Sequence, residues 1–363
     1  MKWLVAGWMV LCLFIAGVGE AVAEDNISPE ELAKIVVEQK IEERIEFGFH
    51  EFEGLSVGLM IPLFDIGEEA TYYLVELHHK DGELGGYMIV DVSDSNFVFI
   101  TEFAAGDVHP YQDISSSDPY YFGHGNYAYE ENEILIDMRT EQPLNKEEIT
   151  FLKKEKKLKE EKSKEDYEED VGDLFAPQTI ISRTYYYISG VGDPQQSDSG
   201  KSEFCAPTAG ANVMMYWKNN GYSKLASSTN WKPVENRLGT LMKWDSKTGT
   251  KISNIAPGER SYIKEKGYKN FSVSTVNSPA FSKLETQTKN KRPPILVLKG
   301  YNYNGNHAVV LVGTEKYHEK LGSKYTWYYN IVVRDQWKST PKDVWFNFGR
   351  GDGSVSHMIS VIP

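Results

Sequence analysis

Cysteine is scarce in this chain of 363 residues, which contains only Cys12 and Cys205. Cys12 lies in an apolar N-terminal segment that we expect to be removed, so one thiol would remain. A single cysteine cannot form an internal disulfide, which excludes a disulfide framework. An unpaired thiol in an exported protein indicates a reactive group, and the alternative is a small buried apolar side chain. Oxidising surroundings favour the reactive group, because they work against keeping a thiol for packing alone.

Long apolar runs are also missing, except at the N-terminus, where Trp3 to Val18 carries no charge. Lys2 precedes this run, and residues 21–23 read Ala-Val-Ala, the small-x-small pattern of a signal-peptidase site. We therefore expect residues 1–23 to be a signal peptide and the protein to be secreted and extracellular. We expect no stable membrane insertion after cleavage. A retained membrane anchor is the alternative, although the run is short for one.

Basic residues are few in the first half. Residues 24–173 hold 13 basic and 38 acidic side chains, a net charge of −25, whereas residues 174–363 hold 25 basic and 13 acidic ones, a net charge of +12. Opposite net charges indicate that one half binds the other. A basic half can also meet an anionic polymer. It carries no nucleic-acid-binding motif, so we expect no nucleic-acid partner.

The N-terminal half predicts a small α+β domain, residues 24–144, without a cluster of catalytic side chains. Ser28 and Glu31 form a capping box ahead of apolar residues at helical spacing, which predicts a helix over 28–49. A β-meander should follow, with a hairpin at residues 79–82. Its expected strands are 71–77, 85–92 and 96–103.

A charged segment separates the two halves. Asn145 and Glu148 can cap a helix, and the residues that follow are dense in charge and nearly free of apolar side chains. We expect a helical linker over residues 145–178. Exposed charged linkers are open to proteases, so a maturation cut is expected between Lys153 and Gln178.

The C-terminal half, residues 179–363, is rich in aromatic and β-forming residues and predicts a second α+β domain. One helix should begin at Cys205 and stop at Asn220-Gly221, and another should cover residues 258–268. An antiparallel sheet should follow these helices. The expected strands are 179–191, 293–301, 306–317, 326–337, 343–348 and 354–363.

The position of Cys205 at a helix start suits a nucleophile. Backbone N–H groups and the macrodipole at such a start stabilise a thiolate, and Pro207 fits the first turn. The dipole contributes only ~0.3–1 kcal/mol, which is under one pKa unit. A nearby imidazolium should therefore do most of the work of lowering the thiol pKa.

Three histidines of the second half are candidates for the base. His307 stands at the mouth of a strongly apolar strand, His318 lies in a charged turn and His357 begins the last strand. We favour His307, because the start of a strand sets its ring at the edge of the sheet. The alternative is that His307 has no catalytic role and only marks the end of a strand.

A third group should orient the imidazole. Asp335 ends the strand that follows His307, so antiparallel pairing of the two strands would bring it back beside the histidine. Asn330 lies in mid-strand and is less well placed. We expect Cys205, His307 and Asp335 to form a catalytic triad; the alternative for Asp335 is a turn residue paired with a neighbouring cation.

Three stretches resemble a known family: CAPTAGANVMMYW at 205–217, NHAVVLVG at 306–313 and VRDQW at 333–337. They resemble papain-superfamily cysteine peptidases, above all the bacteriocin-leader-processing (C39-like) type and its secreted relatives. The resemblance covers about residues 180–363 and implies a papain-like fold, with helices packed on an antiparallel sheet. It implies Cys205 as nucleophile, His307 as general base and acid, and Asp335 as the orienting residue. Asp335-Gln336-Trp337 stands where the superfamily has Asn-x-Trp, with the Trp337 ring shielding the His–Asp bond.

The family also places a glutamine about six residues before the cysteine, where its amide completes an oxyanion hole. This chain has Ser199 there, while Gln195 and Gln196 lie ten and nine residues before Cys205. The resemblance therefore implies Gln196 in this role, on a longer loop.

The N-terminal half resembles the inhibitory prosegments of secreted streptopain-type peptidases, on YYLVEL at 72–77 and GGYMIVDV at 85–92. Together the resemblances imply a secreted cysteine endopeptidase made as a zymogen. It would hydrolyse protein or peptide substrates through an acyl-enzyme, with its acidic prosegment as intramolecular inhibitor. They imply no metal and no cofactor.

Two other functions stay open at this point. The same triad serves cell-wall peptide amidases, transpeptidases and transglutaminases. A non-enzymatic surface-binding module on a peptidase-like scaffold is the further alternative, and an unreactive thiol would favour it.

Overall fold

The computed structural model describes residues 27–67, 69–94, 98–114, 117–166, 178–298, 307–321, 324–348 and 355–363. The expected signal peptide and residues 167–177 of the expected linker lie outside these ranges. The described helices are α1 (Pro29–Glu46), α2 (Lys146–Asp166), α3 (Cys205–Asn219), α4 (Lys232–Leu241), α5 (Ile252–Glu265) and α6 (Phe281–Lys289). No helix among the described residues is long and apolar enough to cross a membrane.

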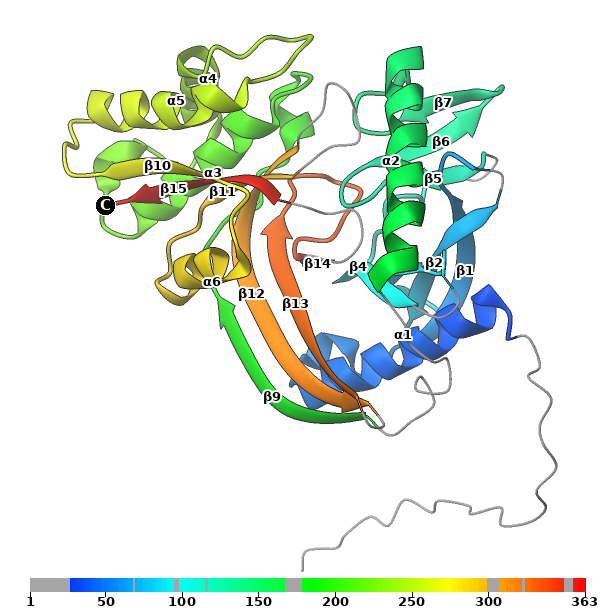
Figure 1. Cartoon of the computed structure of the whole chain (residues 1–363). Helices are drawn as coiled ribbons and strands as arrows, with labels where there is room; N and C mark the ends of the chain where they lie inside the picture. The colour runs from blue at the N-terminus through cyan, green and yellow to red at the C-terminus, as the bar shows by residue number, and fades with distance from the viewer. Residues whose placement is uncertain are drawn as a thin grey trace, which may run out of the picture.

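The described strands make a mixed α+β fold with a large, mainly antiparallel sheet, as the sequence predicts at this level (Figure 1). Those of the N-terminal half are β1 (Ser56–Phe64), β2 (Ala70–His78), β3 (Leu84–Asp91), β4 (Phe99–Ala105), β5 (Pro119–Tyr121), β6 (Tyr127–Glu131), β7 (Ile134–Asp137) and β8 (Gln142–Pro143). Those of the C-terminal half are β9 (Gln178–Tyr187), β10 (Ser272–Asn277), β11 (Ile295–Leu298), β12 (His307–Leu321), β13 (Lys324–Arg334), β14 (Val344–Asn347) and β15 (Val355–Ile362).

Two helices begin at the capping boxes that the sequence contains. The Ser28 hydroxyl accepts a hydrogen bond from the Glu31 N–H at 3.2 Å, so α1 starts where expected, although it ends three residues early. At α2 the capping is reciprocal. The Asn145 side chain accepts from the Glu148 N–H at 3.1 Å, and the Glu148 carboxylate accepts from the Asn145 N–H at 2.7 Å. The linker is therefore helical over its first part.

Other boundaries differ from the sequence expectations. α5 starts at Ile252, six residues before the expected helix at 258, and accommodates Pro257 inside it. Sequence patterns also failed to predict α4, α6, β1, β10 and the short strands β5–β8. Most of these elements are short or polar on one side, so their apolar periodicity is weak. β1 is longer and apolar, but it contains Gly58 and Pro62, which are unusual inside strands.

The centre of the C-terminal half is a strand pair buried on both faces. Ala308 and Val310 of β12 pack with α3 and α5 on one face, whereas Val309 and Leu311 pack against α6 on the other. A sheet covered on both sides needs apolar residues at every position, which explains the uninterrupted run after His307. β11 pairs with the start of β12, Leu298 opposite His307, and so fixes where that histidine stands.

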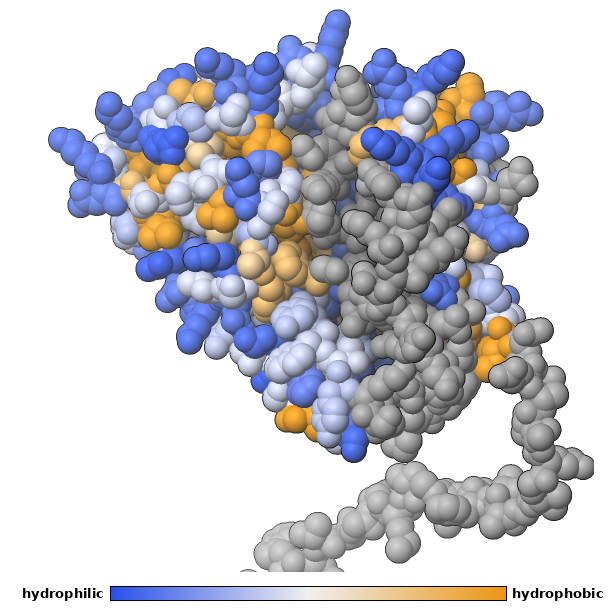
Figure 2. Space-filling model, in the orientation of Figure 1, coloured by the Kyte–Doolittle hydropathy of each residue, from blue (hydrophilic) through white to orange (hydrophobic). Residues whose placement is uncertain are grey.

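The two halves share one sheet. β4 of the N-terminal half pairs with β14 of the C-terminal half, Phe103 opposite Trp345, and their rings stack with centroids 5.3 Å apart. One apolar core runs without interruption from Leu32 in α1 to Val361 in β15. The outer surface is mostly hydrophilic on the face in Figure 2, with apolar side chains in small separate patches. The sequence predicts two domains but not the strand pairing that joins them.

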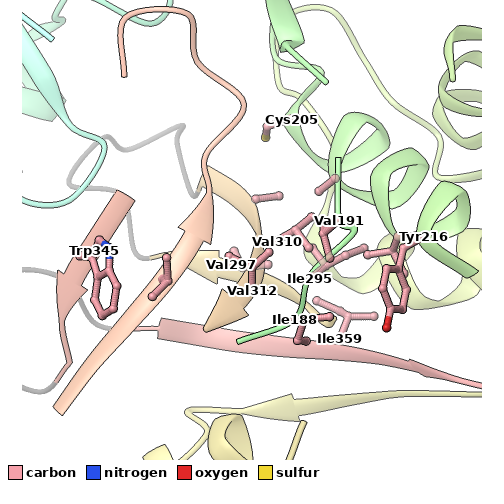
Figure 3. Packing of buried hydrophobic residues seen from close by; sticks show 14 of the residues in the cluster. Ile188, Val191, Cys205, Tyr216, Ile295, Val297, Val310, Val312, Trp345 and Ile359 are labelled. Carbon is pink, nitrogen blue, oxygen red and sulfur yellow. The ribbon is translucent and has the colours of Figure 1, made fainter. Parts of the chain in front are cut away.

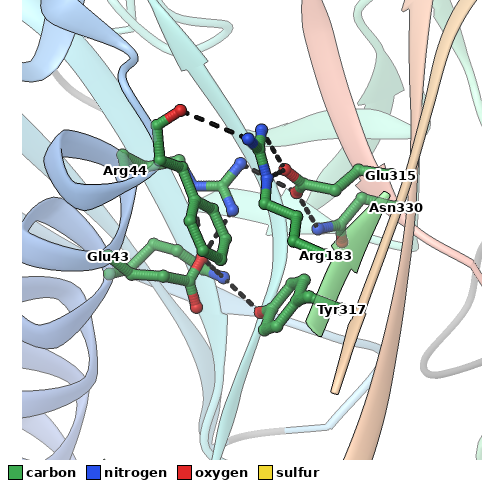
Figure 4. Close-up of polar contacts among 8 residues, drawn as sticks. Glu43, Arg44, Arg183, Glu315, Tyr317 and Asn330 are labelled. Atoms are coloured by element: carbon green, nitrogen blue, oxygen red, sulfur yellow. Dashed lines mark hydrogen bonds and ion pairs between the residues drawn. The ribbon is translucent and has the colours of Figure 1, made fainter. Parts of the chain in front are cut away.

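A buried charge cluster adds to this junction, where α1 lies against the long strands β9 and β12 (Figure 4). Arg44 of α1 is fully buried and lies 2.9 Å from the Glu315 carboxylate of β12, which is also fully buried. Arg183 of β9 binds the same carboxylate at 2.7 Å and donates to the Phe47 carbonyl at 3.2 Å. The Arg44 guanidinium also lies over the Trp345 ring, 5.3 Å from its centroid. The Arg44–Glu315 ion pair thus crosses between the halves, while Arg44 also pairs with Glu43 of its own half.

We predict that Arg44→Ala lowers the free energy of unfolding of the full chain by about 3–5 kcal/mol, because it takes one partner from a buried ion pair. Chemical denaturation followed by tryptophan fluorescence measures this. Arg237→Ala is the matched control, since Arg237 pairs with Glu265 in an exposed position and should change stability far less. Equal effects of the two substitutions would contradict this account of the junction.

Candidate active site

Cys205 is the first residue of α3 and lies at the rim of the packed apolar residues, at the start of the helix (Figure 3). Phe204 before it provides no side-chain cap, so the amides of the first turn are open to other acceptors. The N–H groups of Ala308 and Ala206 face the Cys205 sulfur closely enough to lower the pKa of its thiol. Because Ala308 directly follows His307, the thiol lies near the start of β12. Cys205 is unpaired and buried.

The imidazole of His307 has a defined tautomer. Its Nε2 lies 2.7 Å from the main-chain oxygen of Asp335. A carbonyl can only accept, so Nε2 carries the hydrogen and Nδ1 is the basic nitrogen of the neutral ring. Nδ1 is buried and has no hydrogen-bond partner among the described residues. Nδ1 of His307 is thus a basic nitrogen without a hydrogen-bond partner among the described residues, and it lies at the start of β12.

Asp335 comes back beside His307 as the strand order predicts, but it does so through its main chain. Its carboxylate accepts from the Thr340 hydroxyl at 2.7 and 2.8 Å and from the Trp337 N–H at 3.2 Å. Burial raises the pKa of Asp335 to about 8. The carbonyl, rather than the carboxylate, therefore fixes the imidazole. The Trp337 ring packs over it, 4.9 Å between centroids.

Gln336 makes this arrangement possible. It is fully buried and has a φ of +69°, in the left-handed region that side chains other than glycine rarely adopt. Its side-chain amide donates to the Ala308 carbonyl at 3.2 Å, and its own carbonyl accepts from the Gln196 N–H at 3.0 Å. Gln336, just after the end of β13, thus forms hydrogen bonds with both β12 and the loop before Cys205.

Of the residues considered for the oxyanion hole, the structure brings Gln196 against the site through this backbone bond. Gln196 is nearly buried and starts a 3-10 turn, η3 (Gln196–Ser199). The Gln195 amide donates to Asp193, at 2.8 Å from its carboxylate. The Ser199 hydroxyl donates to the Gln196 carbonyl at 2.7 Å and so closes the turn. The role of Gln196 stays a prediction.

The structure does not bring the other candidates to Cys205. His318 lies eleven residues along β12 and stacks on Trp327, with centroids 4.5 Å apart. His357 lies in β15, separated from β12 by β11. Asn330 donates to Glu315 at 3.0 Å and belongs to the charge cluster at the junction.

The N-terminal half covers the site. Gly125 lies so close that a Cβ added to it would be 3.8 Å from the His307 ring and 4.0 Å from the Trp337 ring. Tyr127 packs edge-on against Trp337 with 5.4 Å between centroids. Arg139 lies near enough to act on both Cys205 and His307 electrostatically.

This cover sets the charge state of the site. Burial raises the pKa of the Cys205 thiol above its ordinary value, against the opposing effect of the N–H groups and of Arg139. Burial, and then the positive charge of Arg139, lower the pKa of His307 to about 3. Thiol and imidazole are therefore both neutral near pH 7. This differs from the lowered thiol pKa that the sequence led us to expect, because helix and histidine are here sealed from water.

Sequence reasoning missed Thr340 and Arg139. Nothing in the sequence marks Thr340, which is one hydroxyl in a polar turn. Arg139 carries a weak signal, because it is the only lysine or arginine from Asp81 to Asn145. Among the described residues, no group of three or more His, Cys, Asp or Glu side chains is arranged to hold a metal ion.

We predict that iodoacetamide labels Cys205 of the full-length chain slowly from pH 6 to 8, and more slowly than a free cysteine peptide at every pH. A raised thiol pKa leaves little thiolate in this range, and thiolate is the reacting form. Mass spectrometry of the Cys205 peptide measures the rate, and labelling in urea gives the rate of the uncovered thiol. A rate that reaches a plateau below pH 7 would show an ion pair instead.

Comparison with known proteins gives one match and one absence. No curated protein matches the chain. Residues 191–350 match the model of the family described as Peptidase_C39 like. This stretch includes Cys205, His307 and Asp335, and it is similar to a C39-like cysteine peptidase.

Proposed function

We propose that the chain is a secreted cysteine endopeptidase made as a zymogen, with Cys205, His307 and Asp335 as its catalytic residues. The observation that carries the proposal is the junction of α3 and β12. A single thiol at a helix start lies close to the N–H of Ala308, the residue after a histidine whose Nδ1 has no hydrogen-bond partner among the described residues. The similarity of residues 191–350 to C39-like peptidases supports the same chemistry.

In the first step Cys205 transfers its proton to Nδ1 of His307, and the sulfur attacks the peptide carbonyl carbon. The tetrahedral oxyanion accepts hydrogen bonds from the backbone N–H of Cys205 and from the Gln196 amide; losing one such donor costs ~2.7–4 kcal/mol. The carbon–nitrogen bond breaks, and His307 protonates the leaving amine. A thioester remains on Cys205.

In the second step His307 takes a proton from water, and the hydroxide attacks the thioester carbon. The acid product leaves, and the proton returns to the sulfur. The Asp335 carbonyl holds Nε2–H throughout, so the ring stays in one orientation while Nδ1 gains and loses the proton. Thr340 and Trp337 anchor Asp335 and thereby position that carbonyl.

The N-terminal half acts in this proposal as an inhibitory prosegment on a papain-like domain. Gly125 and Tyr127 occupy the space over His307 and Trp337 where substrate would lie. Their departure would return water to the site, which favours both charged forms. The thiol pKa would then fall and the histidine pKa would rise, toward the thiolate–imidazolium pair. The cut would fall in the stretch from Lys153 to Gln178, before β9.

We predict that Cys205→Ala reduces hydrolysis by the processed enzyme at least about a thousandfold. His307→Ala should cost nearly as much, because members of a catalytic unit are not additive. Asp335→Ala should cost less, since it keeps the main-chain carbonyl. His357→Ala is the matched control and should be close to wild type.

Thiol-dependent cleavage of casein is the measurement, with purified peptidoglycan as a second substrate. Full activity of Cys205→Ala would exclude the thiol mechanism. Thiol-dependent release from peptidoglycan without casein cleavage would favour the cell-wall amidase or transpeptidase. Crosslinking of casein would favour a transglutaminase. An intact fold without any thiol-dependent reaction would favour a surface-binding module.

We further predict that the cut chain stays inhibited until its halves separate. The contacts that join them include backbone pairing, stacked aromatic rings and fully buried charges, which salt screens weakly. Activity should therefore rise severalfold when the N-terminal fragment is removed by chromatography, and 0.5 M salt alone should achieve little of this. Equal activity before and after separation would mean that the N-terminal half is an anchor or folding aid.

A further inference from the structure

Arg139 of the N-terminal half forms an ion pair with an acidic residue of the C-terminal half near Cys205. It lies in the turn between β7 and β8, and its guanidinium Nη1 is 3.0 Å from the Glu203 carboxylate of the C-terminal half. Both side chains are nearly buried, with 8% of Arg139 and 12% of Glu203 exposed. Asp137, in the same half as Arg139, lies 3.9 Å from its Nε. The arginine therefore crosses the junction to reach an acid beside the thiol.

Glu203 lies in the loop before α3, two residues before the proposed nucleophile Cys205. It adopts a left-handed backbone, φ +55°, and its carbonyl accepts from the Trp244 indole N–H at 3.1 Å. The pocket around it is lined from the C-terminal half by Ser202, Glu203, Ser246 and Lys247. Glu203 is the acid among these four, and it stays in place when the N-terminal half leaves.

The pair is incomplete without the N-terminal half. Removing the N-terminal half takes away the cation that lies 3.0 Å from the Glu203 carboxylate. An uncompensated acid in such a place binds a cation strongly.

We propose that Glu203 is the specificity residue of a subsite for arginine, and that Arg139 fills this subsite as a built-in substrate mimic. The preferred arginine is the residue that contributes the attacked carbonyl, because Glu203 is so close in the chain to Cys205. The inference rests on the proposed peptidase function and adds its substrate class, basic peptides cut after arginine. A guanidinium suits the site better than an ammonium group, because its planar fork can engage both carboxylate oxygens.

The fold also explains why the chain would not be cut at Arg139. The Asp137 carboxylate accepts from the N–H groups of Arg139 and Thr140, at 2.8 and 2.9 Å, and the Glu141 N–H donates to the Asp137 carbonyl at 2.8 Å. These bonds coil the backbone into a tight turn. A substrate must offer an extended carbonyl to the sulfur, whereas here only the side chain enters the subsite.

The test uses two peptide chloromethyl ketones that are identical except for a final arginine or a final citrulline, the uncharged isostere. The Cys205 sulfur displaces chloride from the probe and forms a thioether, which mass spectrometry quantifies. In the processed enzyme, separated from the N-terminal fragment, the subsite is vacant, and the arginine probe should label Cys205 at least about tenfold faster than the citrulline probe. The full-length chain, in which Arg139 fills the subsite, is the matched control and should show no such preference.

Glu203→Gln in the processed enzyme should bring the ratio of the two rates close to one. Glu265→Gln, which removes an exposed carboxylate paired with Arg237, should leave the ratio unchanged. Equal labelling of the processed enzyme by the two probes, or a ratio that survives Glu203→Gln, would overturn the subsite. Cleavage of casein by the processed wild-type enzyme tests the peptidase function separately, so the two failures are distinguishable.

Discussion

The pairing of β4 with β14 is the contact on which the covering of the candidate active site depends. It joins the strands of two halves of opposite net charge into one sheet, and Gly125 and Tyr127 of the N-terminal half lie over His307 and Trp337. Every electrostatic property of the site follows from that cover. A sealed thiol and imidazole stay neutral, whereas the same groups at an open helix start would favour charge separation.

The junction combines contacts with different physical roles. The stacked rings and the apolar core that the two halves share supply most of the adhesion, since they remove apolar surface from water. The Arg44–Glu315 pair joins α1 to β12 through two fully buried charges, and removing either one would leave the other uncompensated. The Arg139–Glu203 contact is small by comparison, yet it connects the N-terminal half to a residue two positions before Cys205.

The sequence was sufficient to place the parts that local rules control. Cys205 at a helix start, His307 at a strand start and Asp335 at the end of the next strand follow from periodicity and antiparallel order. The hydrogen bond between His307 and the Asp335 carbonyl could not be predicted, because it depends on the left-handed backbone of Gln336. Nor could the β4–β14 pairing, which joins strands about 240 residues apart and depends on packing that no local pattern encodes.

The carbonyl that holds His307 also bears on how the site tolerates mutation. An acceptor that belongs to the main chain is present whatever side chain occupies position 335, so substitution there changes packing but does not delete the bond. The vulnerable position is instead Gln336, whose left-handed conformation aims that carbonyl at the ring. A β-branched residue at 336 would resist this conformation. Amino-acid substitution at this site is therefore limited by the backbone conformation at position 336 more than by the identity of the side chain at position 335.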